Sequence, residues 1–166
     1  FKGLDKMMHD QNKVGYAFGE YLRCVFLESE TAMAVLTSAP AIEGPDSIRM
    51  LNNDEMIGTR ELFERLEGTN RLINHSVVHP NKPAGLETMD RRADWCTPAG
   101  WKVYTLYGAL GRGPFESTLP AWMLDDEQSG LPFLDRVRET GVKTISIHKG
   151  LSTDEDLSWD GPSSPR

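Results

Sequence analysis

Three features that would indicate a specialised class of protein are scarce or absent in this sequence: cysteine, long apolar runs and an apolar leader. Cys24 and Cys96 lie far apart without a Cys-x-x-Cys spacing, which argues against a disulfide framework or a zinc knuckle. No apolar run reaches the roughly 18 residues of a membrane-spanning helix, and no signal peptide is evident. We therefore expect a cytoplasmic protein with no membrane partner, in which both cysteines are small buried hydrophobic residues.

Clustered positive charge is also lacking. The chain has 18 Lys and Arg residues against 25 Asp and Glu residues, a net charge of −7, and its basic residues are scattered. Because nucleic-acid binding needs a basic face for the phosphate backbone, we expect no nucleic-acid partner. The 166 residues, 39% of them hydrophobic, suffice for one globular domain that covers residues 1–166. A small molecule is the expected partner, and the sequence leaves a homo-oligomer open.

Strand and helix patterns alternate along the chain. Residues 1–15 have no clear pattern and form a lead-in, and residues 152–166 resemble a loop cut in mid-course. Periodicity predicts helices at 16–27, 53–66, 84–96 and 132–140, with Asn53 as a cap and with Gly68 and Gly141 as helix ends. Strands are expected at 32–36, 71–79, 100–105 and 142–150, the first of them buried on both faces.

This alternation predicts an α/β fold in which right-handed crossovers join about four parallel strands. Four strands are too few for a closed eight-stranded barrel, and an open half-barrel would leave two bare strand edges. Two architectures therefore remain: a small doubly wound domain, or a part of something larger.

His148 is the strongest single candidate for chemistry. In the strand 142–150, Thr144, Ser146 and His148 share one face, while Ile145 and Ile147 share the other. His148 lies at the carboxyl end of this strand, where parallel α/β proteins keep their functional groups. Neutral imidazole is a common metal ligand and a general base near neutral pH.

Two other strands contribute polar candidates. Lys102 lies in the middle of the strand Trp-Lys-Val-Tyr-Thr, where it requires a partner, a shifted pKa or a wet cavity, and Tyr104 shares its face. His75 and His79 point to the same side of their strand, but apolar residues in both alternate sets leave that side undecided. We expect His79 to reach a site mouth and His75 to be a core histidine.

The stretch from Tyr107 to Leu124 is rich in glycine and proline. Its Gly108–Gly113 segment has glycines but no following helix to hold a phosphate, which argues against nucleotide binding. A mobile loop over a pocket is the better interpretation, with Trp122 and Phe115 as the aromatic residues of a lid. The acidic residues 125–127 are expected to cap the next helix.

Five segments together resemble the amidohydrolase superfamily, in its group of metal-dependent hydrolases and decarboxylases. They are Val25–Leu36, His75-Ser-Val-Val-His-Pro-Asn81, Trp101-Lys-Val-Tyr-Thr105, Leu124–Leu134 and Ile147-His-Lys-Gly-Leu151. The resemblance implies a partial (β/α)8 TIM barrel with a divalent metal, zinc or else manganese, at its carboxyl mouth. It places His148 at the metal ligand on the fifth barrel strand, and Lys102 on the fourth strand, where some members use a carboxylated lysine.

The same resemblance implies that a metal-activated water attacks a small carbonyl substrate, an amide, ester or lactone. His79, Tyr104 and Trp122 are the expected substrate contacts, and no catalytic acid or base is assigned. The sequence contains no His-x-His pair and no sixth or eighth strand, which implies an internal piece of a barrel that is active only when complete. A metal-dependent decarboxylase and a non-catalytic α/β binding or assembly domain remain the alternatives.

Overall fold

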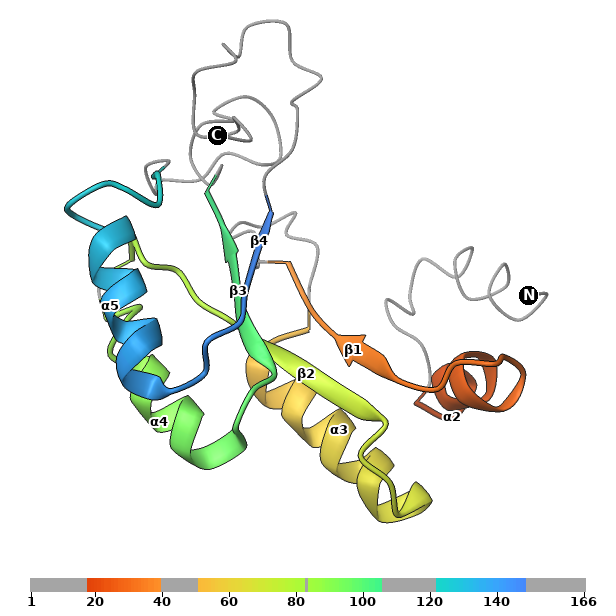
Figure 1. Cartoon of the computed structure of the whole chain (residues 1–166). Helices are drawn as coiled ribbons and strands as arrows, with labels where there is room; N and C mark the ends of the chain where they lie inside the picture. The colour runs from red at the N-terminus through yellow and green to blue at the C-terminus, as the bar shows by residue number, and fades with distance from the viewer. Residues whose placement is uncertain (1–17, 40–50, 83, 106–121, 149–166) are drawn as a thin grey trace, which may run out of the picture.

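A computed structural model describes residues 18–39, 51–82, 84–105 and 122–148 of the chain (Figure 1). Helices and strands alternate as predicted. In chain order they are α2 (Phe18–Leu22), the π-helix η1 (Arg23–Leu27), β1 (Ala34–Leu36), α3 (Asn53–Glu67), β2 (Leu72–Val77), α4 (Thr88–Cys96), β3 (Gly100–Tyr104), α5 (Gly130–Thr140) and β4 (Ile145–His148).

The four strands form one parallel sheet in the order β1-β2-β3-β4, which curls like half of a barrel. Strands that follow one another in the chain are thus neighbours in the sheet. A doubly wound sheet reverses its strand order at a switch point, and no reversal occurs within the described strands. The α/β prediction is confirmed. Two architectures were left open, and the consecutive strand order matches part of a barrel wall and not a doubly wound sheet.

Two apolar clusters attach the helices to one face of this sheet. The larger cluster lies between β3, β4, α4 and α5, and its buried members are Val78, Met89, Trp101, Val103, Trp122, Phe133 and Val137. The smaller one joins η1, α3 and β2 through the buried Phe26, Phe63 and Leu72, and the partly buried Tyr21 and Leu22 of α2 pack against it. Each such side chain contributes roughly 1.5–3 kcal/mol when fully buried, so these contacts dominate the stability of the helix side.

Local capping sets the bounds of α3. Asn52 is the N-cap, because its side chain accepts a hydrogen bond from the Glu55 backbone while the Glu55 carboxylate accepts one from the Asn52 backbone. The prediction of Asn53 as the cap was wrong by one residue. Gly68 ends the helix with a φ of 68°, as expected, because glycine adopts this left-handed conformation without strain.

β1 differs from its prediction. It was expected to be buried on both faces, but Val35 is 45% exposed and the preceding Met33 is 61% exposed. The reason is its place at the edge of the sheet, where it pairs only with β2 and no described element covers its second face.

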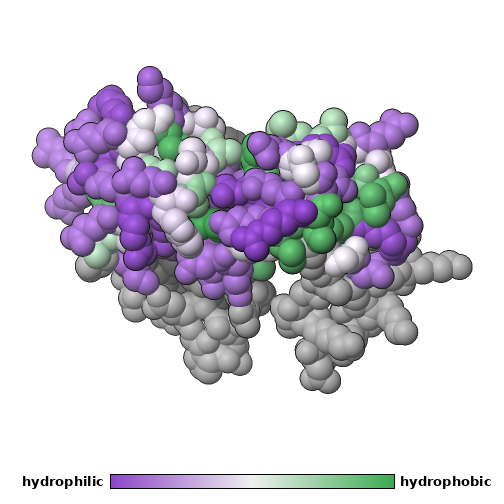
Figure 2. Space-filling view, turned by 90° about the horizontal axis from the view of Figure 1, so that it is seen from below, coloured by the Kyte–Doolittle hydropathy of each residue, from purple (hydrophilic) through white to green (hydrophobic). Residues whose placement is uncertain are grey.

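Seen from below, the surface over α4 and α5 is mostly hydrophilic, and apolar side chains gather on the other side, where α2 and α3 lie (Figure 2). The exposed large hydrophobic residues include Leu27 of η1 and Leu62 and Leu66 of α3. Among the described helices, none is both long and apolar enough to cross a membrane.

Candidate functional site

The sheet face that none of the described helices covers holds a row of polar side chains. Lys102 lies beside Ser146 in the register of β3 and β4, and Tyr104 lies beside His148. Ile145 and Ile147 pack on the opposite side, against the larger apolar cluster. The predicted division of β4 into an apolar and a polar face is therefore confirmed, and it brings Lys102, Tyr104 and His148 together.

Lys102 is half-buried in the centre of this row. Its Nζ lies 3.5 Å from Ser146 Oγ, at the outer limit of a hydrogen bond, and 4.8 Å from the centroid of the Tyr104 ring. Partial burial lowers the pKa of the Lys102 amine, because removal from water disfavours the charged form. Lys102 is therefore a desolvated amine with weak partners, which makes it available to a bound molecule.

Tyr104 and His148 stack face to face. Their ring centroids are 4.6 Å apart and the ring planes differ by 19°. Burial raises the pKa of the Tyr104 phenol, so it remains protonated and can donate a hydrogen bond. His148 itself is exposed, and stacking fixes the plane of its imidazole at the carboxyl end of β4.

His75 belongs to the same face, contrary to the expectation of a core histidine. It is half-buried, and its Nδ1 lies 3.2 Å from Thr37 Oγ1. Burial and, secondarily, the charge of Lys102 lower the pKa of His75, which favours the neutral imidazole. The alternate residues Asn74 and Ser76 are the ones that turn toward the helices, where Arg60 and Arg92 contact them. In the sequence, Arg60 and Arg92 on the helices were the signal that could have predicted which side of β2 carries His75.

Trp122 is not brought together with these residues. Its side chain is 3% exposed and packs in the larger apolar cluster, edge to face with Phe133. Its indole N–H donates to the Tyr104 carbonyl oxygen at 3.0 Å. The structure thus places Trp122 beneath β3 as a core residue, where it supports the backbone of Tyr104 rather than lying on the polar face. The glycine-rich loop before it lies outside the described residues.

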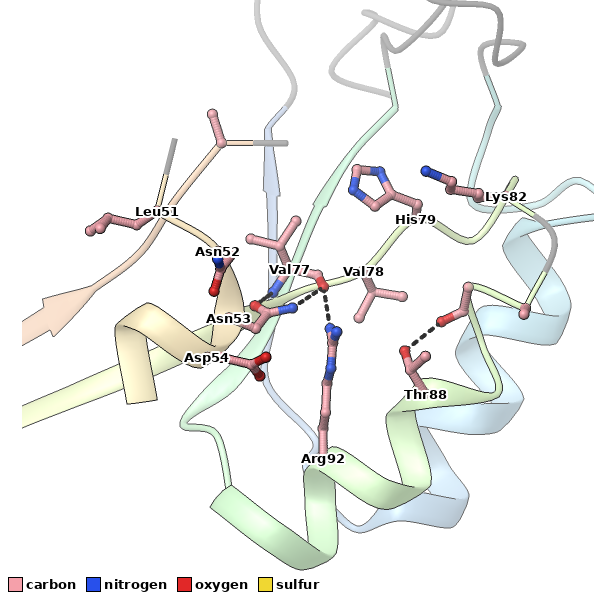
Figure 3. A pocket seen from close by; sticks show the side chains of 13 residues that line it. Leu51, Asn52, Asn53, Asp54, Val77, Val78, His79, Lys82, Thr88 and Arg92 are labelled. Atoms are coloured by element: carbon pink, nitrogen blue, oxygen red, sulfur yellow. Dashed lines mark hydrogen bonds between the residues drawn. The ribbon is translucent and has the colours of Figure 1, made fainter. Parts of the chain in front are cut away.

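His79 lies beyond the end of β2, where it lines a pocket of about 410 Å³ (Figure 3). The pocket is at the carboxyl end of the sheet, between the start of α3 and the segment that leads into α4. Asn53 fixes the start of α3 to the end of β2 in this pocket. Its side chain donates to the Val77 carbonyl oxygen at 3.0 Å and accepts from the Val77 N–H at 2.7 Å. Sequence reasoning placed His79 at a site mouth but missed this pocket.

A metal site is not complete in this part of the chain. Lys102 and His148 are the two predicted ligands, and a catalytic zinc ion needs three protein ligands. No group of three or more His, Cys, Asp or Glu side chains that could hold a metal occurs among the described residues. The residues that the structure describes therefore do not fit a divalent metal by themselves, and further ligands would have to come from elsewhere.

Comparisons with models of known protein families, with curated protein sequences and with solved structures find no match to this chain.

Proposed function

We propose that this chain forms part of the wall of a (β/α)8 barrel in a metal-dependent hydrolase that acts on a small amide, ester or lactone. The observation that carries the proposal is the row of Lys102, Tyr104 and His148 on the face of a consecutively ordered parallel sheet that no described helix covers. In barrels of this kind, functional side chains lie at the carboxyl ends of the strands and point to the interior.

Barrel geometry accounts for the polar row better than an isolated sheet does. A lysine on a strand is costly to bury, yet Lys102 is half-buried with only a marginal hydrogen bond to Ser146. On the inner wall of a barrel the same amine faces a cavity that admits water and substrate. The remaining strands, and the remaining metal ligands, would lie outside the described residues.

The residues of the row can hold a carbonyl substrate and, in this proposal, the metal that activates it. The Lys102 amine can donate a hydrogen bond to a carbonyl oxygen, and the protonated Tyr104 phenol can do the same. His148 presents an imidazole whose plane is held by the Tyr104 ring, and in this proposal it is one ligand of the metal. His75 supplies a neutral imidazole next to Lys102 on the same face.

Elemental analysis of the purified protein tests the metal assignment. It requires the product of the whole gene, with any sequence that precedes Phe1 or follows Arg166. We expect bound zinc or manganese, and a loss of most of that metal in His148→Ala. Thr144→Ala is the matched control, because Thr144 is an exposed residue just before the same strand and lies far from its carboxyl end.

Absence of metal from the unaltered protein, or an undiminished metal content in His148→Ala, would overturn the assignment. If metal is present, hydrolysis is assayed with small amide, ester and lactone substrates. Release of carbon dioxide from carboxylated substrates, without hydrolysis, would identify a decarboxylase instead.

A further inference from the structure

Two buried tryptophans of the larger apolar cluster each donate their indole N–H to a backbone carbonyl oxygen. Trp101 Nε1 donates to the Val142 carbonyl oxygen at 3.1 Å, just ahead of β4. Trp122 Nε1 donates to the Tyr104 carbonyl oxygen at 3.0 Å, at the carboxyl end of β3. Because the strands are parallel, the two bonds lie at opposite ends of the sheet.

The Tyr104 carbonyl oxygen lies where β2 cannot supply a donor. In the ladder between β2 and β3, the Val78 N–H donates to the Lys102 carbonyl oxygen at 2.9 Å. Donors on one side of a strand recur every second residue, so the next donor would be the N–H of residue 80. That residue is proline, which has no N–H. The Trp122 indole supplies a donor in its place.

Trp122 also holds the end of β3 through its backbone. Its N–H donates to the Thr105 carbonyl oxygen at 3.2 Å, so this one residue caps two successive carbonyl groups. Its side chain is 3% exposed and meets Phe133 of α5 edge to face, with the ring centroids 6.0 Å apart. The carboxyl end of β3 is thereby attached to α5.

The segment that begins at Trp122 is fixed on α5. Asp126 Oδ2 accepts a hydrogen bond from the Met123 N–H at 3.0 Å. At Gly130, the first residue of α5, a Cβ atom would lie 2.2 Å from the Met123 carbonyl oxygen, so this close approach requires glycine. Trp122 is therefore held from the side of α5 and can act as a support for β3.

Tyr104 connects this support to the polar row. It is the last residue of β3, and its ring stacks on His148 with the centroids 4.6 Å apart. Lys102 Nζ lies 4.8 Å from the centroid of the same ring. The end of a strand opens easily unless its backbone is held, and the Trp122 indole bonds the backbone of the residue whose ring lies against His148.

We propose that Trp122 is a positioning residue of the candidate site. From beneath the sheet it fixes the Tyr104 backbone, and the Tyr104 ring in turn fixes the imidazole plane of His148. The inference rests on the proposed function only for the importance of the polar row. Its test needs neither a metal nor a substrate, so its failure and the failure of the hydrolase assignment are distinguishable.

NMR of the His148 ring protons tests this role, with His148→Gln to assign the signals. The stacked Tyr104 ring shifts these signals upfield, and Tyr104→Leu gives their position without stacking. We expect Trp122→Phe, which keeps an aromatic ring but loses the indole N–H, to lose most of the upfield shift. The signals are compared at the basic limit of each pH titration, so that a change in protonation does not imitate a loss of stacking.

Trp101→Phe is the matched control, because it removes the same kind of bond from the same apolar cluster at the opposite end of the sheet. It should lower stability and yet keep the upfield shift of His148. A merely structural role of Trp122 predicts equal effects of the two replacements on His148. Such equal effects, or an unchanged shift in Trp122→Phe, would overturn the proposal.

Trp122 is a core residue, so its replacement can prevent folding. Asp126→Ala then decides the question, because it keeps Trp122 but releases the Met123 N–H that holds the segment on α5. It should reduce the upfield shift of His148, whereas Asp125→Ala, at an exposed neighbour, should keep it. An undiminished shift in Asp126→Ala would count against the positioning role.

Discussion

The Asn53 side chain forms two hydrogen bonds with the backbone of Val77, one to its carbonyl oxygen and one from its N–H, at the point where β2 ends. Replacement by alanine leaves the Val77 N–H without its partner in a buried position, whereas the Val77 carbonyl keeps its bond from Arg92. We expect Asn53→Ala to lower the free energy of unfolding by about 1–3 kcal/mol, measured by urea denaturation.

Asn53→Asp is the control for this prediction. A carboxylate still accepts the hydrogen bond from the Val77 N–H but cannot donate to the Val77 carbonyl. The loss of stability should therefore be smaller than in Asn53→Ala. Equal losses in the two variants would show that the bond to the N–H is not the one that matters.

Lys102 carries a prediction about pH. Its pKa in the folded chain is lowered from 10.5, so between the folded and the unfolded pKa the unfolded chain binds more protons. The contribution of Lys102 to the free energy of unfolding therefore rises as the pH rises through that interval, so the desolvation cost is greater below the interval than above it. We expect Lys102→Met to be more stable than the unaltered protein at pH 7, with a difference that shrinks as the pH approaches 10.5.

Urea denaturation at several pH values measures this difference. Tyr104 and His75 also face the Lys102 amine. Both residues are present in the unaltered protein and in Lys102→Met, so their own titration contributes to the stability of both. Lys143→Met is the control, because Lys143 is exposed and should show no such trend. A Lys102→Met variant that is less stable at pH 7 would show that the contacts with Ser146 and Tyr104 outweigh desolvation.

At the scale of elements, Asp126 organises the entry to α5. Its Oδ1 accepts hydrogen bonds from the backbone N–H groups of Gln128, Ser129 and Gly130, and its Oδ2 accepts one from Met123. Desolvation alone would raise the pKa of Asp126, but these four bonds outweigh it and lower the pKa. The expected role of the acidic residues 125–127 as a cap is thus confirmed for Asp126.

We expect Asp126→Ala to lower the free energy of unfolding at pH 7 by about 1–2 kcal/mol, as for the loss of a helix cap. Because the folded pKa is the lower one, this contribution is present above the unfolded pKa near 3.8 and is lost as the pH falls through the folded value. The measurement is urea denaturation at pH 7 and at pH 3. Asp125→Ala, which alters an exposed neighbour with no such bonds, should change little, and equal effects would contradict the capping role.

At the scale of the whole molecule, the sheet is unevenly covered. β3 lies between β2 and β4, and its residues Trp101 and Val103 are fully buried, whereas β1 is an edge strand with an exposed Val35. Two backbone N–H groups are suited to a comparison of centre and edge. The Trp101 N–H donates to the Thr144 carbonyl oxygen at 2.9 Å, and the Ala34 N–H donates to the Arg71 carbonyl oxygen at the same distance.

Amide hydrogen exchange should distinguish these two groups. We expect the Trp101 amide to exchange more slowly than the Ala34 amide by about tenfold or more, because opening the centre of the sheet disrupts the larger apolar cluster. Equal protection of the two amides would show that the edge of the sheet is covered as well as its centre.

The sequence by itself determined the local features of this fold. The alternation of Ile145 and Ile147 with Ser146 and His148 follows from the two-residue period of a strand, and it correctly assigned both faces of β4. Gly68 and Gly141 marked the ends of α3 and α5 because a left-handed residue favours glycine. Such features depend on a few neighbouring residues, so a local pattern suffices to predict them.

Only the tertiary structure decided which distant residues meet. The orientation of His75 depends on contacts that Arg60 and Arg92 make with its neighbours in β2, and the burial of Trp122 depends on the core between β3 and α5. The pocket exists because Asn53 of α3 and Arg92 of α4 converge on one peptide group of β2. The hydrogen bonds among them join residues separated by 14 or more positions in the chain. Strand register and helix packing, which no local periodicity encodes, bring these residues together.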